Sequence, residues 1–179
     1  MKKIIVAISA SLALISSAHS EGTSWIAPDF PSNFSLSDTE QAQQWALCAA
    51  TLEVLAEVTR DLAKKPATAD RLDSFSSGAK TAIIGAFVVK MLERTEGKTN
   101  AEVQDIIKET FSYAAMASKE YPSLKKTEIL SDLELREDKK TWYADLGVSA
   151  KACLQKPVLE LQQTYIDMVR NLASGVGEN

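Results

Sequence analysis

Apolar side chains recur at helical spacing through most of this chain, and this periodicity restricts the folds that it can adopt. One stripe near the start is spaced at three, four, three and seven residues, which places its members on one face of a helix. Its members are Trp45, Cys48, Leu52, Leu55 and Leu62. No segment of useful length alternates apolar and polar residues, as a half-buried strand would. The sequence therefore predicts an all-α fold.

Capping residues, glycines and prolines set the boundaries of the expected helices. Thr68 or Asp70 is expected to begin the second helix, and Pro122 to end the third. Thr99 and Glu102 have the spacing of a capping box at the start of that third helix. Together the segments predict one bundle of five or six helices. The expected helices cover residues 37–65, 67–94, 99–121, part of 123–140, 139–153 and 157–175.

Both cysteines of the chain fall on apolar stripes. Cys48 shares its stripe with Trp45, and Cys153 shares one with Trp142 and Leu146. Two cysteines in an exported protein predict one disulfide bond, between Cys48 and Cys153, with the two tryptophans beside it. A reactive thiol pair is the alternative, but the chain has no Cys-x-x-Cys motif and no neighbouring histidine to lower a thiol pKa. A bridge across roughly 100 residues stabilises a fold by up to about 4–5 kcal/mol.

Residues 1–20 have the pattern of a secretory signal peptide. Lys2 and Lys3 precede an apolar run, and Ala18 and Ser20 are small residues at the positions that cleavage requires. We expect cleavage after Ser20 and a periplasmic or secreted mature protein. An uncleaved anchor helix is the alternative, but it would need a longer apolar run, and we expect no membrane span in the mature chain.

Residues 21–36 are predicted to form an extended N-terminal arm ahead of a helical domain at 37–179. Prolines at positions 28 and 31 interrupt any regular element there. The arm carries Trp25, Phe30 and Phe34, which are too apolar for a tail that stays free in water. We expect the arm to cover a groove of its own domain, or to bind a partner protein through these aromatic residues.

Charge and composition exclude several functions. The chain has 24 acidic and 20 basic residues, and two basic residues leave with the signal peptide, so the mature net charge is about −6. This charge disfavours nucleic acid and anionic membranes as partners. The single histidine, His19, also lies in the signal peptide, which leaves none for a general base, a Ser-His-Asp triad or an imidazole metal site. We expect no metal and no cofactor.

The remaining candidates for catalysis are carboxylates and one serine–lysine pair. Glu53 and Glu57 lie one helical turn apart, but their position off the apolar stripe favours a solvated face. Ser76 and Lys80 are also one turn apart, a spacing that is common by chance. The densest acidic stretch, residues 132–138, is predicted to be an exposed charged turn. We therefore expect no enzyme, with a carboxylate-based hydrolase as an alternative.

Two non-enzymatic functions are consistent with the sequence. The first is binding of another exported protein, in an inhibitor, immunity-type or assembly role, and it predicts a large apolar or acidic surface patch. The second is carriage of a small apolar ligand in an inter-helix cavity of at least about 300 Å³. Two of its glycines lie seven residues apart on one face, a pattern for which close packing of a neighbouring helix is the commoner cause. The expected cavity residues are Gly78, Gly85, Phe87, Trp142 and Tyr143.

Overall fold

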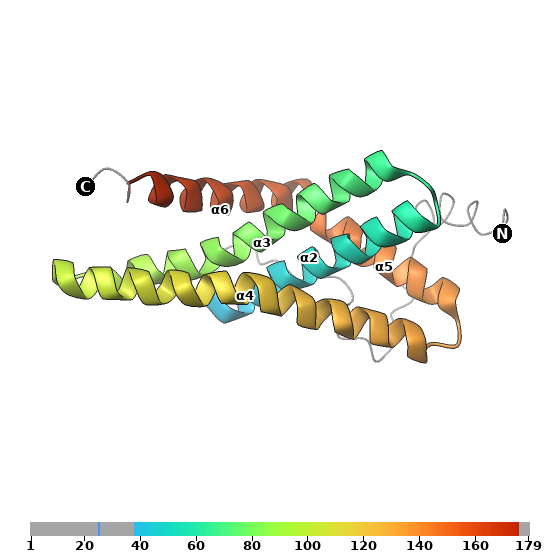
Figure 1. The fold of residues 1–179 in the computed structure, drawn as a ribbon, viewed down its shortest axis with the longest axis horizontal. Helices are drawn as coiled ribbons and strands as arrows, with labels where there is room; N and C mark the ends of the chain where they lie inside the picture. The colour runs from blue at the N-terminus through green and yellow to red at the C-terminus, as the bar shows by residue number, and fades with distance from the viewer. Residues whose placement is uncertain (1–24, 26–37, 176–179) are drawn as a thin grey trace.

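The computed structural model describes Trp25 and residues 38–175, and this part of the chain is an elongated bundle of five α-helices (Figure 1). No strand occurs in these residues, so the predicted all-α bundle is confirmed. The predicted signal peptide, Phe30 and Phe34 lie outside the described residues. The helices are α2 (Asp38–Asp61), α3 (Pro66–Thr95), α4 (Asn100–Leu135), α5 (Lys139–Cys153) and α6 (Lys156–Gly175).

The helices differ in how much of the bundle they cover. α4 runs along almost the whole molecule, whereas α2 and α5 lie towards one end, on the right in Figure 1. α6 lies towards the other end, beside the second part of α3. α3 packs against α2, α4 and α6, while α2 packs against α3, α4 and α5. We call the end with α2 and α5 the closed half, and residues 86–95 of α3, 100–116 of α4 and 164–175 of α6 the open half.

The disulfide bond crosses the core of the closed half. The Cys48–Cys153 bridge is present as predicted, links α2 to α5, and has a Cα–Cα distance of 5.5 Å. Trp45 lies in the same core and meets Tyr165 of α6 edge to face, with ring centroids 6.0 Å apart. The buried Tyr165 hydroxyl donates a hydrogen bond to Gln41. A structural disulfide indicates an oxidising compartment, such as that of an exported protein.

Trp142 lies in a second core, and its predicted position beside the disulfide is wrong. It is fully buried against Leu47, Ile129 and Leu146, and its indole N–H donates to the carbonyl of Ile129 at 3.1 Å. Trp142 and Cys153 share a face of α5, but the eleven residues between their positions correspond to about 16 Å along the helix axis. Two residues on one stripe can therefore belong to different cores.

α4 continues through Pro122 for 36 residues, so the predicted helix end at that proline is wrong. A proline inside a helix removes one backbone hydrogen bond and costs about 3 kcal/mol. The helix beyond it, however, carries Ile129, which is fully buried in the second core, and Pro122 itself is buried. The short helix and turn expected over 123–140 are accordingly part of one long helix, because burial of its far end outweighs the lost hydrogen bond.

The start of α3 also differs from the prediction, whereas the start of α4 agrees with it. α3 begins at Pro66 without a side-chain cap, so neither Thr68 nor Asp70 caps it. Proline suits the first turn of a helix because the backbone N–H that it lacks would have no partner there. Thr99 and Glu102 form the predicted capping box, and its hydrogen bonds hold the pKa of Glu102 below the ordinary value.

Among the described residues, α3 is long and apolar enough to cross a membrane by length and composition alone. Half of its most apolar window is buried inside the bundle. Core helices pass the same test, so this feature is weak evidence for a membrane span, and the expectation of none stays a prediction.

Candidate functional site

Side chains of α6 fill the space beside the two glycines of the expected cavity, Gly78 and Gly85. A Cβ atom added at Gly85 would lie 2.6 Å from the Cβ of Tyr165, and one at Gly78 would lie 2.4 Å from the side-chain nitrogen of Gln162. That nitrogen donates to the carbonyl of Phe75 at 2.9 Å. Both glycines therefore allow α6 to approach α3 closely, as the explanation by close packing expected.

The aromatic residues of the expected cavity are divided between two places. Trp142 and Tyr143 pack edge to face in the second core, with ring centroids 5.1 Å apart. Phe87 lies on α3 and meets Tyr113 of α4 edge to face, also at 5.1 Å. The structure thus does not bring the five residues together around one cavity.

Trp25 is buried in the second core by several directional contacts. It is 1% exposed and lies 6.2 Å from the ring of Trp142. Its indole N–H donates to Asp132 at 3.2 Å, and the hydroxyl of Ser149 donates to its carbonyl at 3.2 Å. The guanidinium of Arg136 lies 5.8 Å from the ring centroid. Trp25 therefore packs against α4 and α5 of its own chain.

The acidic stretch at 132–138 agrees only in part with its prediction as an exposed turn. Glu134, Glu137 and Asp138 are exposed, whereas Asp132 lies in the last turn of α4 and is partly buried, as is Arg136. Arg136 forms an ion pair with Asp132 at 2.8 Å and a second with Asp145 of α5, and its side chain is 14% exposed. Burial opposes the charge of Arg136, but the bonds to Asp145 and Asp132 hold its pKa above the ordinary value. The pattern of mixed charges in the sequence could not show that Asp145 and Trp25, both distant along the chain, would contact this segment.

The candidate catalytic groups Ser76, Lys80 and Glu53 each have a partner within the bundle. Ser76 is buried and donates to the carbonyl of Ala49 at 2.9 Å, so its hydroxyl is held by the backbone. Lys80 forms an ion pair with Glu53, which lies 4.0 Å from Lys126 as well. Glu53 is therefore a half-buried member of an ion-pair network that joins α2, α3 and α4, and not part of a free solvated face.

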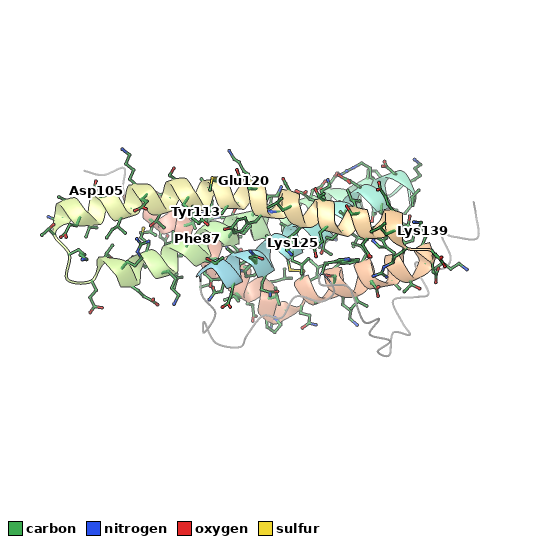
Figure 2. All side chains as sticks on the ribbon, turned by 90° about the horizontal axis from the view of Figure 1, so that it is seen from below. Phe87, Asp105, Tyr113, Glu120, Lys125 and Lys139 are labelled. Carbon is green, nitrogen blue, oxygen red and sulfur yellow. A yellow bond between two sulfur atoms is a disulfide. The ribbon has the colours of Figure 1, made fainter. Side chains whose placement is uncertain are left out.

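A groove between α3 and α4 in the open half is the strongest candidate for a binding site. Its volume is about 750 Å³, within the range of ligand and peptide sites. Phe87 and Tyr113 lie beside each other between the two helices, with Asp105 further along α4 (Figure 2). We call this site the α3–α4 groove. It is lined by Thr39, Phe87, Lys90, Met91, Arg94, Asp105, Lys108, Glu109, Thr110, Ser112, Tyr113 and Met116.

The groove combines exposed apolar groups with one polar atom that lacks a partner. Tyr113 and Met116 are 43% and 44% exposed, which is high for large apolar side chains. Thr110 is only 8% exposed, and its hydroxyl oxygen has no hydrogen-bond partner among the described residues. A buried hydroxyl without a partner costs about 1–3 kcal/mol, so a bound group that supplied one would be favoured.

Charges of both signs surround the apolar part of the groove. Lys90 pairs with Glu93 on its own helix at 3.2 Å. Arg94 and Lys108 have no carboxylate partner among the described side chains, and Asp105 and Glu109 line the groove beside them. The groove therefore offers an apolar floor and a rim of mixed charge.

A second groove lies on the other side of the open half, between α3 and α6. Its volume is about 570 Å³, and Leu92 at its edge is 48% exposed. It lacks an aromatic pair and a buried hydroxyl without a partner. We call it the α6 groove. It is lined by Leu92, Thr164, Asp167, Met168, Asn171 and Leu172.

Comparisons of the chain with protein-family models, with curated proteins and with solved structures gave no match. Within the described part of the chain, no group of three or more histidine, cysteine, aspartate or glutamate residues could hold a metal ion. The fold and the site define a disulfide-linked helical bundle with an open inter-helix groove, and any function must be argued from that groove.

Proposed function

We propose that this protein is an exported, non-enzymatic binding protein that recognises another exported protein through the open half of its bundle. The observation that carries the proposal is the α3–α4 groove, in which Tyr113 and Met116 are exposed above the buried Phe87 and Met91, beside a rim of charged residues. Apolar patches rimmed by polar residues are typical of protein interaction sites. The expected signal peptide and the disulfide bond support a site of action in the periplasm or outside the cell.

The rigidity of the closed half supports the same proposal. The disulfide joins α2 to α5, and the Trp25 contacts and the Arg136 ion pairs join the end of α4 to α5 and the N-terminal segment's Trp25. A rigid base reduces the conformational entropy that is lost when the other end binds a partner.

Site-specific photo-crosslinking tests this proposal. A photoreactive phenylalanine analogue at position 113 lies in the α3–α4 groove, and the same analogue at position 124 lies on α4 outside it. Leu124 is 68% exposed, so the control is at least as accessible as Tyr113. We expect a discrete crosslinked protein from position 113 in cells that produce the chain, and none from position 124. Equal crosslinking at both positions, or none at position 113, would contradict the proposal.

Carriage of a small amphipathic ligand is the second candidate, and the volume of the groove supports it. About 750 Å³ is enough for a ligand of drug or lipid size. Native mass spectrometry of the protein purified from its source would then show a bound small molecule. Loss of that mass in the Met116→Glu variant, with retention in Leu124→Glu, would place the ligand in the groove.

A further inference from the structure

We infer that the α3–α4 groove binds one amphipathic α-helix of the partner, two to three turns long, in line with α2. This inference rests on the proposed function and names the partner's secondary structure and chemistry. The groove is a direct continuation of a contact that the chain already makes. α2 packs against both α3 and α4, and Thr39 in its first turn borders the groove.

The packing of α2 shows that a helix fits between α3 and α4. Ala42, Ala46 and Ala49 are completely buried in the core that α2 shares with α3 and α4, at the spacing of one helical face. α2 begins at Asp38, while α3 and α4 continue beyond it into the open half (Figure 1). A second helix placed end to end with α2 would therefore meet the same two flanking helices.

The size of the groove sets the length of the bound helix. Along α3 the lining runs from Phe87 to Arg94, which is about 10 Å at 1.5 Å per residue. Along α4 it runs from Asp105 to Met116, which is about 16 Å. A helix of two to three turns has this length, so a short helical segment fills the groove.

The lining specifies the chemistry of that helix. The buried Phe87 and Met91 form the bottom of the groove, and the exposed Tyr113 and Met116 offer apolar contact surface above them. The side chain of Met116 can adapt to partners of varied shape. The bound face must therefore be apolar at i, i+3, i+4 and i+7. Opposite Thr110 it carries a polar side chain, such as asparagine or serine, that satisfies the buried hydroxyl. Charges of both signs flank this face, because the rim of the groove has both.

Methyl NMR locates the bound helix directly. The chain has four methionines, of which Met91 and Met116 line the α3–α4 groove and Met168 lines the α6 groove. The oxidised full chain, labelled at methionine methyl groups, is titrated with a synthetic amphipathic peptide of about three turns that has a leucine face and one central asparagine. A peptide of equal composition with its leucines spread around the helix is the control.

We expect the signals of Met91 and Met116 to shift with the amphipathic peptide and the signal of Met168 to stay in place. The control peptide should shift none of them. A shift of Met168 alone, or no shift at all, would overturn the inference. Shifts of Met91 and Met116 that depend on protein concentration without peptide would also overturn it, because they would assign the groove to a second copy of the chain.

Thr110→Val tests the polar contact separately. Valine has nearly the shape of threonine and removes the hydroxyl, so the free protein should be as stable as before or more stable. Binding of the asparagine peptide should weaken roughly fivefold, because its central side chain loses a hydrogen bond. Unchanged affinity would contradict the assignment of Thr110 to the interface.

The two tests separate failure of this inference from failure of the proposed function. If photo-crosslinking at position 113 captures a partner but the peptide leaves Met91 and Met116 unchanged, the protein binds a partner that does not use a helix there. If crosslinking captures nothing while the peptide binds as expected, the groove accepts a helix but the proposed function fails.

Discussion

The closed half and the open half of the bundle share α3 and α4 but differ in what surrounds them. In the closed half, α2 and α5 flank the two long helices, the disulfide crosses the core, and Trp25 adds a further layer over Trp142. In the open half, α6 covers one side of α3, and the described residues leave the seam between α3 and α4 uncovered. The disulfide and the second core thus lie in the closed half, while the open half keeps exposed apolar side chains such as Tyr113 and Met116.

The largest expected effect concerns Trp25. Trp25→Ala leaves a void beside Trp142 and removes the hydrogen bond to Asp132, so we expect a loss of about 3–5 kcal/mol in the free energy of unfolding. Urea denaturation of the oxidised protein measures it. Trp25→Phe keeps most of the packing and should cost about 1–2 kcal/mol. A loss below about 1 kcal/mol for the alanine variant would show that the closed half does not depend on the arm.

Removal of the disulfide should have the next largest effect. Cys48→Ser combined with Cys153→Ser opens a link between residues separated by 105 positions, and we expect a loss of about 2–4 kcal/mol. Thermal denaturation with and without reductant measures the same quantity in the unchanged chain. Because the bridge lies in the closed half, the Met116 methyl signal of the folded variant should match that of the parent. An unchanged midpoint of unfolding would contradict the structural role of the bridge.

The two glycines of α3 test the contact with α6. Gly85→Ala places a methyl group 2.6 Å from the Cβ of Tyr165, which cannot move without its backbone, so we expect a net loss of about 1–2 kcal/mol. Gly78→Ala meets only the end of the flexible Gln162 side chain, and the better helix propensity of alanine offsets that cost. Denaturation curves of the two variants should therefore differ clearly, and equal losses would contradict the geometry at Gly85.

The smallest expected effect is a dependence of stability on high pH. Burial raises the pKa of Tyr165 to about 12, from an ordinary value of 10.0. Between these values the unfolded chain loses the proton while the folded chain keeps it, so stability should fall as the pH rises through this range. Tyr165→Phe removes this contribution, and the difference between the two stability profiles isolates it from other groups. Parallel profiles between pH 10 and 12 would show that the hydroxyl is not buried.

Much of the fold could be predicted because it depends on local sequence signals. The apolar stripes predicted the helices, and the even number of cysteines predicted the disulfide bond. The spacing of Thr99 and Glu102 predicted the capping box of α4. Pro122 misled the prediction because its cost is local, whereas the burial of Ile129 that compensates it is decided by tertiary contacts.

The site was harder to predict for the same reason. Phe87 was identified among the candidate residues, but Tyr113, Met116 and Thr110 were missed, since nothing in their spacing distinguishes them from ordinary surface residues. The groove exists because α2 begins at Asp38 while α3 and α4 extend past it. Relative helix length and packing, which no single motif encodes, determine where such an opening lies.

Hydrogen exchange resolved along the oxidised chain tests the contrast between the two halves most directly. We predict the slowest amides in α2, in α5 and in the parts of α3 and α4 that pack against them. Amides at 100–113 of α4 should exchange at least about tenfold faster, because local opening there exposes less apolar surface. Equal protection along the whole of α4 would contradict the account, since it would show that the open half is as firmly held as the closed one.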